Sequence, residues 1–510
     1  MQQIMNMERD KNHFDFVIVG SGFAGSITAM CLKQLGYRVC MIEKDKHPRF
    51  SVGESSTPIA DMILRDLSRK YDLPFFMHLS RYGTWQTEHP EIICGLKRGF
   101  SYYPHEIGNT FSSNDDHLNE LLVAASFDDD NSDTNWLRSD VDQFLAGKAC
   151  EIGVLFYEEA EVVRVHRTEA SVWEIAIKKD QKQMLIHSVW IIDATGSPHF
   201  SGKFFGTTSS ADGFETNSTA IFTHFNEAGY WFEYLTSRGF NTKDYPYNPD
   251  HSALHHLIKE GWIWMLRFNN GLLSAGLLME NSDSSNGIDA EKIWHSVINQ
   301  YPSLSKIFRY SKPAEIPGKF INSGRLQRKL NRSFGDGWIA LNHTVGFVDP
   351  LHSTGIAHTL AGVEKIVNLF GKAGLNKIEI SDIKIIQEES SKELKFIDKL
   401  VSMSYQSRHD FALFSASVML YFIASIRYEQ SRLKGDIPNT FLCADHEDLS
   451  AIIEETHHEL KMLDSETAGQ EQIHKQIETI RGRIEPYNSV GLMDPSKKNM
   501  YRHTAVNLIN

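Results

Sequence analysis

An apolar run near the N-terminus predicts a buried strand that leads directly into a helix. The run Phe14-Asp-Phe-Val-Ile-Val-Gly20 is followed by apolar residues at helical spacing from Ser26 to Leu35. A second apolar run, Tyr37-Arg-Val-Cys-Met-Ile42, then predicts a second strand that ends at Glu43. The pattern therefore predicts a complete strand–helix–strand unit at the start of the chain.

The turn of this unit carries the pattern G-x-G-x-x-G at Gly20, Gly22 and Gly25. In dinucleotide-binding folds the first glycine makes a tight turn, the second lets the backbone approach a pyrophosphate, and the third lets helix and strand pack closely. Glu43, 18 positions after Gly25, is placed to accept hydrogen bonds from ribose hydroxyls. A carboxylate there disfavours a 2′-phosphate, so FAD or NAD is expected rather than NADP. A glycine-rich turn without a nucleotide is the alternative.

A second strand-to-helix turn is predicted at the end of Gly346-Phe-Val-Asp-Pro-Leu-His-Ser-Thr-Gly355. The apolar run Trp338–Leu341 predicts a buried strand before it, and helical spacing of apolar residues from Ile356 to Phe370 predicts a helix after it. Unpaired N–H groups and the helix dipole favour an anion at such a helix start. The local pattern alone also fits a helix start without a ligand.

Between these turns the pattern changes several times. Residues 59–73 have helical periodicity, whereas 92–103 alternate like a strand that carries Lys97 between two glycines. A lysine on a strand is ordinarily a solvated residue. Residues 109–135 are polar and acid-rich, which predicts a loop or flap whose charges, including those of 128–133, are solvated. A helix is predicted from about 135 to 151.

Residues 201–330 are rich in aromatics and alternate, which predicts an antiparallel sheet from segments 218–224, 229–234, 261–266 and 272–278. Trp262 and Trp264 share one face of a predicted strand, where they form either sheet core or the wall of an aromatic pocket. Beyond residue 376 helical patterns continue to about Pro486.

Composition excludes several classes of protein. The 510 residues carry a formal net charge of −13, which disfavours binding to nucleic acid or to an anionic membrane. The longest apolar stretch, Phe411–Ile426, contains serines and is too short for a membrane span, so it predicts a buried helix. Five scattered cysteines suit a reducing cytoplasm and argue against a disulfide framework. Neither cysteine nor histidine spacing predicts a metal site.

Four motifs together resemble the flavin-dependent halogenases, which belong to the FAD monooxygenases with a glutathione-reductase-type nucleotide fold. They are the G-x-G-x-x-G unit, Gly53-Glu54-Ser55, Trp262-x-Trp264 and Phe347-x-x-Pro350-x-x-Ser353-x-Gly355. The resemblance covers residues 14–370. Two positions depart from it: the family's W-x-W-x-I-P continues here as Met-Leu-Arg267, and the Gly-Asp dipeptide before the Asp-Pro pair is replaced by Asn342-His343.

The resemblance implies an α/β fold in three parts. A Rossmann-type FAD-binding domain would comprise residues 14–200 and 331–372, with segment 85–135 inserted near the substrate site. Residues 201–330 would form an antiparallel-sheet substrate domain, and 377–510 a helical C-terminal region. The FAD-contacting residues implied are Gly20, Gly22, Phe23, Ala24, Gly25, Glu43, Lys44, Glu54, Ser55, Arg138, Val162, Asp193, Pro350 and Ile356.

The resemblance also implies a reaction. Reduced FAD and oxygen would convert chloride or bromide, held by the backbone N–H groups of Thr354 and Gly355, into hypohalous acid. This acid would then reach Lys97, which would hydrogen-bond it as an ammonium or form a haloamine. Arg98 cannot replace Lys97, because a guanidinium does not deprotonate.

The substrate implied is a small phenol. Tryptophan-acting members carry a glutamate within the halide motif, where this chain has His352, so free tryptophan is not expected. Trp262, Trp264 and His352 are the expected pocket residues, and a carrier-bound pyrrole or acyl chain is an alternative substrate. His352 and His105 are both candidates for deprotonating a phenol and equally for structural histidines.

The sequence also leaves competing functions open and indicates which partners to expect. A flavin hydroxylase, a prenyl-chain saturase and a non-catalytic nucleotide-binding protein are the competing functions. Since the chain has no second G-x-G-x-x-G for a nicotinamide nucleotide, a separate NAD(P)H-dependent flavin reductase is expected to supply FADH2. The protein is also expected to be cytoplasmic and to form a homodimer.

Overall fold

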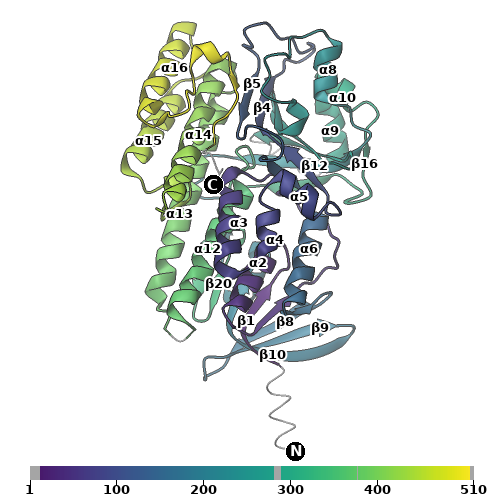
Figure 1. The fold of residues 1–510 in the computed structure, drawn as a ribbon, viewed down its shortest axis with the longest axis vertical. Coiled ribbons are helices and arrows are strands. Elements are labelled where there is room, and N and C mark those ends of the chain that lie inside the picture. The colour runs from purple at the N-terminus through teal and green to yellow at the C-terminus, as the bar shows by residue number, and fades with distance from the viewer. Residues whose placement is uncertain (1–11, 281–288, 376, 506–510) are drawn as a thin grey trace, which may run out of the picture.

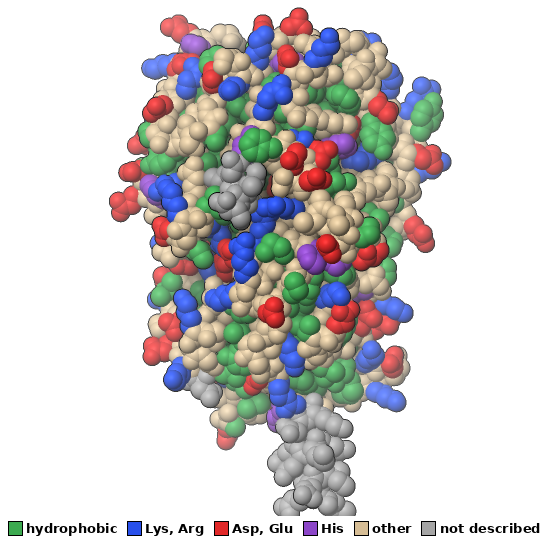
Figure 2. Space-filling view, viewed as in Figure 1, with side chains coloured by type: hydrophobic (Ala, Val, Ile, Leu, Met, Phe, Trp, Pro, Cys, Tyr) green, Lys and Arg blue, Asp and Glu red, His purple; other side chains and the backbone are tan. Residues whose placement is uncertain are grey.

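Two large β-sheets and a block of long C-terminal helices make up the computed structural model, which describes residues 12–280, 289–375 and 377–505 (Figure 1). The sheet that contains β1 lies at the N-terminal end, and the sheet that contains β4, β5 and β12 lies beyond it. Helices α13 to α16 run along one side of the molecule. Acidic and basic side chains are interspersed over the face drawn in Figure 2.

The first sheet has eight strands in the order β19-β20-β10-β1-β2-β7, with β9 and β8 added beside β10. Its central strands are parallel, as expected when crossover helices connect them. The predicted strand–helix–strand unit is confirmed as β1, α2 and β2. The elements are β1 (His13–Val19), α2 (Phe23–Gln34), β2 (Val39–Ile42), β7 (Leu155–Tyr157), β8 (Glu161–Arg167), β9 (Trp173–Lys179), β10 (Lys182–Asp193), β19 (Phe334–Gly335) and β20 (Trp338–Ala340).

Two glycines of the first turn are required by the packing of this sheet. Gly20 has φ +105°, and a Cβ there would lie 2.4 Å from the carbonyl oxygen of Ala194 at the end of β10. A Cβ on Gly25 would lie 2.0 Å from the carbonyl oxygen of Gly20. Both positions therefore need glycine to bring β1, α2 and β10 together.

The second sheet has nine strands in the order β16-β12-β15-β14-β13-β4-β5-β22, with β17 beside β12. Most pairs are antiparallel, but β13 with β4 and β22 with β5 are parallel. One face joins the large core shared with the first sheet and the C-terminal helices, and the other covers a second core. The strands are β4 (Gly99–Pro104), β5 (Leu121–Ala124), β12 (Ser218–Asn226), β13 (Ala253–Ile258), β14 (Gly261–Arg267), β15 (Leu273–Glu280), β16 (Lys312–Pro313), β17 (Ile321–Arg325) and β22 (Met500–Tyr501).

The structure corrects three sequence predictions. Residues 92–103 are two strands in different sheets, because the chain turns at Arg98 between β3 (Cys94–Lys97) and β4. The segment 109–135 is not simply a loop: it contains β5, which is fully buried, and the start of β6 (Asp133–Trp136). The segment 229–234 is not a strand, since α8 (Trp231–Ser237) begins there and places Trp231 in the second core.

The C-terminal helices pack on α12, the helix that follows the second predicted turn. The buried carboxylate of Glu393 on α13 binds both His358 and Lys365 of α12, and Arg432 of α14 binds Glu364 of α12. Helix α14 is long and apolar enough to span a bilayer by composition, but 83% of that apolar window is buried in the protein, so it is a core helix as predicted. The helices are α12 (Thr354–Ala373), α13 (Ile380–Ser407), α14 (Phe411–Leu433), α15 (Glu447–Met462) and α16 (Gln470–Ile484).

Shorter elements connect these layers. The two-stranded sheet pairs β3 with β6, and a three-stranded sheet has the order β11-β18-β21. The remaining elements are α3 (Pro58–Tyr71), α4 (Pro74–His78), α5 (Tyr82–Glu88), α6 (Arg138–Glu151), α7 (Pro198–Phe205), α9 (Ala290–Ile298), α10 (Pro302–Ile307), α11 (Asn342–Val345), β11 (Ser209–Ser210), β18 (Arg328–Leu330), β21 (Gly346–Phe347) and the 3-10 turns Pro249–His251, Phe441–Cys443, Glu485–Tyr487 and Pro495–Lys497.

We predict that Gly95→Ala destabilises the fold, because its Cβ would lie 1.9 Å from the carbonyl oxygen of Arg267. The backbone must then shift, and overpacking of this kind costs about 1–3 kcal/mol. The matched control is Gly147→Ala on the exposed surface of α6, where a Cβ meets nothing within 4 Å and a gain of about 0.5–1 kcal/mol is expected. Urea unfolding of both variants measures the difference; equal stability would contradict the close approach of β3 to Arg267.

Candidate active site

Lys97 is fully buried at the end of β3, so it is not the solvated residue that a lysine on a strand ordinarily is. Strand β3 pairs with β6, which places Lys97 directly opposite Asp133. The glycines on either side of Lys97 allow this burial: a Cβ on Gly95 would overlap the Arg267 carbonyl, and one on Gly99 would lie 1.9 Å from the carbonyl oxygen of Val123. Lys97 thus lies between two close backbone approaches, that of β3 to Arg267 and that of β4 to β5.

The ammonium group of Lys97 has three kinds of neighbour. Its Nζ donates to the backbone carbonyl of Ser56 at 2.5 Å, lies 3.9 Å from Oδ2 of Asp133, and lies 4.3 Å from the centre of the Phe100 ring. Burial lowers the pKa of Lys97 to about 8, and the nearby carboxyl of Asp133 is the main group that opposes that shift. An amine with this pKa can gain or lose a proton near physiological pH.

Aromatic side chains from three elements gather next to this amine. The Phe100 ring on β4 contacts His255 of β13 at 6.0 Å and both Tyr421 and Phe422 of α14, at 5.8 and 5.5 Å between ring centres. Burial lowers the pKa of His255 to about 3, so its ring is neutral. The amine end of Lys97 therefore faces an apolar, aromatic region covered by α14.

His352, the predicted pocket histidine, lies at the edge of the same aromatic group. Its ring stacks on Tyr421 with centres 4.6 Å apart, and its Nε2 approaches the hydroxyl of Ser404 at 3.4 Å. Its Nδ1 is buried without a hydrogen-bond partner among the described residues. Burial lowers the pKa of His352 to about 4, so a neutral ring can offer a hydrogen-bonding nitrogen to a polar ligand.

His105, the other candidate base, lies on the opposite face of the nine-stranded sheet. Its Nε2 is 2.9 Å from Nδ1 of His256, and both rings pack on Trp231 in the second core. Adjacent residues of β13 point to opposite faces, which separates His256 from His255. The structure therefore favours a structural role for His105.

The two tryptophans on β14 lie in the main core. Trp262 donates from Nε1 to the hydroxyl of Tyr405 on α13 at 2.9 Å and contacts His255 at 5.1 Å between ring centres. Trp264 lies flat across Gly276, where a Cβ would be 2.1 Å from its ring, and donates to Ser274. Only Trp262 of the pair contacts a residue of the aromatic region next to Lys97, through His255.

The second predicted turn adopts a conformation suited to an anion. Ser353 caps α12 with φ +51°, and its hydroxyl donates to that of Ser55 at 3.1 Å. Thr354 and Gly355 form the first helical turn, whose N–H groups have no acceptor within the helix. A Cβ on Gly355 would meet only Phe347, at 4.0 Å, so the space beside it is open. Pro350 accepts from the N–H of Ser353, and Ile356 is buried in the core.

Residues 53–56 connect this turn to Lys97. Ser55 contacts Ser353 on one side of the segment, and the next residue, Ser56, accepts from Lys97. Glu54 is buried and paired with His224 of β12 at 2.8 Å; burial opposes the charged imidazole, but Glu54 raises the pKa of His224 overall. The same short segment therefore contacts both predicted functional groups and is anchored to the second sheet.

The glycine turn Gly20–Gly25 has two arginine side chains close to Gly22. The three atoms nearest to a Cβ on Gly22 would be side-chain atoms of Arg138, Asp142 and Arg49, at 3.4–3.7 Å. The N–H of Phe23 at the start of α2 donates to Asp142, so a carboxylate already uses the anion-binding end of this helix. Arg138 binds the carbonyl oxygens of residues 52 and 53 and the carboxylate of Asp142. This donor set fits a nucleotide diphosphate.

The other predicted FAD contacts are positioned as follows. Glu43 is buried at the end of β2 and accepts from the backbone and hydroxyl of Ser21. Burial opposes its charged form, but Arg49 and these donors lower the pKa of Glu43 overall. Val162 lies on β8 and Ala24 in the first turn of α2, both buried, whereas Lys44 is exposed. The carboxyl of Asp193 binds Thr195 and Ser201.

Sequence reasoning missed Asp61, Asp133, Phe100 and Tyr421, which line or support the lysine. Asp133 lies in an acid-rich run that predicts solvated charges, yet it is 3% exposed. Pairing β3 with β6 would have placed Asp133 opposite Lys97 and so indicated that this aspartate is buried. Tyr421 belongs to a helix that is apolar on all sides, so periodicity does not identify which face meets the site.

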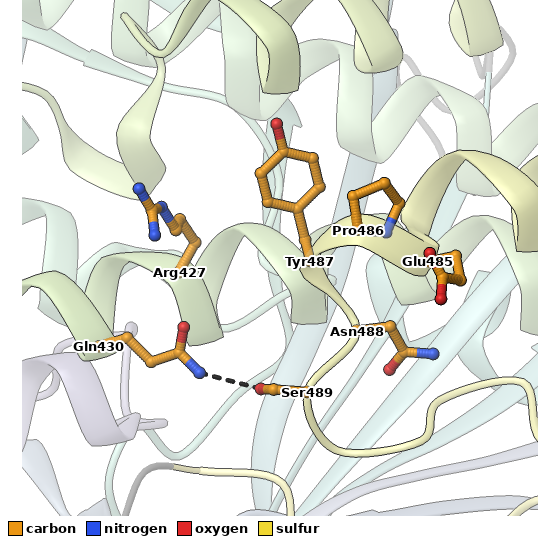
Figure 3. Close-up of a pocket in the computed structure, with 7 residues that line it drawn as sticks. All are labelled: Arg427, Gln430, Glu485, Pro486, Tyr487, Asn488 and Ser489. Carbon is orange, nitrogen blue, oxygen red and sulfur yellow. Dashed lines mark hydrogen bonds between the residues drawn. The ribbon is translucent and has the colours of Figure 1, made fainter.

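A hollow of about 200 Å³ lies elsewhere, between α14 and the chain that follows α16 (Figure 3). Gln430 of α14 donates to Ser489 across it. It is lined by Arg427, Gln430, Glu485, Pro486, Tyr487, Asn488 and Ser489. None of these is a predicted site residue, and the site around Lys97 is a separate region.

The chain is similar to several known halogenases. Monodechloroaminopyrrolnitrin halogenase PrnC from Pseudomonas fluorescens is 26% identical over 469 residues, which cover 86% of this chain and 80% of that protein. Tetracycline 7-halogenase from Kitasatospora aureofaciens is 22% identical, with 81% and 73% covered. The crystal structure of halogenase PltM with phloroglucinol and FAD has a TM-score of 0.83 at 21% identity, covering 97% of this chain and all of that one.

The family described as tryptophan halogenase matches residues 15–70 and 138–418. The match begins with the glycine turn and extends through Trp262, the Ser353–Gly355 turn and the first C-terminal helices. Because it spans more than half of the chain, the protein belongs to this family and is a flavin-dependent halogenase.

Proposed function

We propose that this halogenase attaches chlorine or bromine to an electron-rich phenol at Lys97. The observation that carries the proposal is the segment 53–56, which contacts both the Ser353 turn and the Lys97 amine. Hypohalous acid formed at the Ser353 turn would have to pass the segment 53–56 to reach the Lys97 amine. The aromatic region at Lys97 would then hold the acceptor ring.

The residues of the first turn would hold FAD. The backbone at Gly22, with Arg138, would bind the diphosphate, and the N–H of Phe23 would join once Asp142 releases it. Glu43 would bind the ribose once its present contacts with Ser21 are exchanged for contacts with the sugar. Bound reduced FAD would supply the oxygen chemistry that converts halide to hypohalous acid. Glu54, Ser55, Pro350 and Ile356 would border the flavin end, with Thr354 and Gly355 donating backbone hydrogen bonds to the halide.

Lys97 would act as a hydrogen-bond donor to the oxidant. Its ammonium has three protons, and the Ser56 carbonyl accepts one. Another proton can reach hypohalous acid, which makes hydroxide a better leaving group when the ring attacks the halogen. The halogen then bonds to a ring carbon while the O–X bond breaks, and the displaced hydroxide takes a proton from Lys97 and leaves as water. The same ring carbon loses its C–H proton, which balances the proton that Lys97 gave up.

A phenol fits the covering of this site better than a charged substrate does. The neutral His255 and His352 and the rings of Phe100 and Tyr421 offer stacking surfaces with few fixed charges. The free Nδ1 of His352 can accept a phenolic O–H. The phloroglucinol complex of PltM, a protein of the same fold, gives independent support for this substrate class.

Partners and location are part of the same proposal. A separate NAD(P)H-dependent reductase would supply FADH2, because the sequence has one dinucleotide-binding glycine motif. Five free cysteines, four of them buried, fit a reducing compartment such as the cytoplasm. We propose a homodimer as the working assembly, to be tested by light scattering.

The substrate class is tested by incubating the protein with FAD, a flavin reductase, NADH, oxygen and either halide. The panel contains resorcinols, phloroglucinol, simple phenols, tryptophan and a carrier-bound pyrrole. A halogen isotope pattern on a phenol in mass spectra is the expected result. Halogenation confined to tryptophan or to the carrier-bound pyrrole would overturn the phenol assignment.

We predict that Lys97→Met lowers the halogenation rate by about 10²–10⁴-fold, the range for loss of a proton donor. Methionine keeps the side-chain length but cannot donate. NADH consumption and peroxide release should continue, because the flavin end is unchanged. Lys148→Met on α6 is the control and should retain activity; equal loss of halogenation and flavin turnover in Lys97→Met would contradict the role.

Gly22→Val should fold yet bind FAD at least about 100-fold more weakly, because a branched side chain blocks the approach of the diphosphate. The fold tolerates it, since the nearest atoms to a Cβ are the ends of arginine and aspartate side chains. FAD titration followed by flavin fluorescence measures the loss. Gly147→Val is the control, and wild-type FAD affinity in Gly22→Val would refute the nucleotide site.

Gly355→Ala should raise the halide KM by about tenfold or more with little change in stability. The methyl group would enter open space beside the first turn of α12, where the halide is proposed to bind. Halogenation rates across a bromide series, with thermal unfolding in parallel, separate the two effects. An unchanged halide KM would place the halide elsewhere.

A further inference from the structure

Four buried ionisable side chains form a cluster at the Lys97 amine. Lys97 is 0% exposed, Asp61 2%, Asp133 3% and Arg65 6%. Asp133 comes from β6, whereas Asp61 and Arg65 lie four residues apart on one face of α3. Charges so deeply buried are strongly unfavourable unless they are paired, so their arrangement determines the state of the lysine.

Asp133 is the carboxylate that faces the amine. It lies directly across the β3–β6 pair from Lys97, which puts the two side chains on the same face of this small sheet. The distance between Nζ and Oδ2 is 3.9 Å, within ion-pair range but too long for a hydrogen bond. Asp133 therefore acts on the amine through its charge and leaves the N–H groups of Lys97 available to a ligand.

Asp61 holds Asp133 in place. The two carboxyl groups hydrogen-bond each other, which requires one proton between them because carboxylates only accept. Burial raises the pKa of both carboxyls, but Lys97, which lies opposite Asp133 and 3.9 Å from its Oδ2, lowers that of Asp133, and this geometry favours the shared proton on Asp61. The Ser56 hydroxyl, on the residue whose carbonyl binds Lys97, donates to Asp61 at 3.1 Å.

We propose that Asp133, fixed by a protonated Asp61, is a positioning residue that keeps Lys97 in the ammonium form needed to donate to hypohalous acid. This inference rests on the proposed role of Lys97 in halogenation. It assigns different charges to two buried aspartates that sequence alone does not distinguish: Asp133 is the anion and Asp61 the neutral hydrogen-bond donor.

The other titratable groups around Lys97 do not supply this negative charge. His255 on β13 and His352 before α12 are neutral because burial lowers their pKa values to about 3 and 4. Burial raises the pKa of Tyr421 on α14, which keeps it neutral as well. Arg65 on α3 is a cation, and its charge acts on Asp61 and Asp133. Asp133 is thus the anion among the groups that face the amine.

The test is direct titration of Lys97 in protein labelled with 13C at the lysine ε-carbons, with the signal assigned by its loss in Lys97→Met. Asp133→Asn removes the anion, and the midpoint should fall by about one pH unit or more, as expected for loss of an opposite charge at this distance. Asp61→Asn replaces a neutral donor with another neutral donor, so the midpoint should stay within about 0.3 units of wild type. Asp129→Asn, an exposed carboxylate paired with Arg98, is the control and should also leave it unchanged.

An unchanged midpoint in Asp133→Asn would overturn the proposal. If that variant does not fold, Asp61→Asn decides the question, because a fall of one unit or more there would show that Asp61 carries the charge. This titration does not depend on turnover, so it is informative even if no arene is halogenated.

A second readout links the titration to catalysis. Below the midpoint the lysine is an ammonium, so the halogenation rate should fall as pH rises through it, and in Asp133→Asn this fall should occur at lower pH by the same shift. If wild type halogenates no arene, the proposed function fails. If wild type halogenates and the pH profile of Asp133→Asn coincides with it, the positioning role alone fails.

Discussion

Burial of the Lys97 amine is the constraint on which the rest of the site depends. An ammonium in an apolar interior is costly, and proteins retain one only with a nearby counter-charge and hydrogen-bond acceptors. Here the Ser56 carbonyl, the Asp133 carboxylate and the Phe100 ring provide these within 4.3 Å. Glycines at 95 and 99 let neighbouring strands approach closely enough to exclude water from the lysine.

The same constraint explains why segments far apart in sequence meet here. The segment 53–56 follows the first sheet, Lys97 and Asp133 come from an inserted pair of strands, and Ser353 begins a helix nearly three hundred residues after Ser55. Helix α14 then covers the aromatic side of the amine with Tyr421. Buried ion pairs join α13 and α14 to α12, so the helix that covers the amine is anchored to the helix that begins at the Ser353–Gly355 turn.

Local signals predicted the parts of this fold that depend on local structure. The glycine turn, the strand before it and the start of α12 follow from residues adjacent in sequence, and all three are confirmed. The acid-rich segment 109–135 was predicted as a solvated loop because composition reports average polarity. Its short apolar run, Leu121–Ala124, is nevertheless a buried strand.

Long-range pairing explains what the sequence could not reveal. Whether Lys97 is solvated or buried depends on β6 and α3, neither adjacent to it in the chain. Likewise, Tyr421 lies on a helix without a polar face, so no periodicity marks the side that meets the site. The family resemblance predicted roles for Lys97 and for the Ser353–Gly355 turn, whereas the carboxyl pair at Lys97 became visible only in the three-dimensional structure.

The central claim is that halide and amine occupy opposite sides of the segment 53–56. Anomalous diffraction from crystals of the FAD complex soaked in bromide tests it most directly. We predict a bromide peak within hydrogen-bonding distance of the backbone nitrogens of Thr354 and Gly355, separated from Lys97 by Ser55 and Ser56. A bromide bound at the Lys97 amine, with none at the start of α12, would contradict the account.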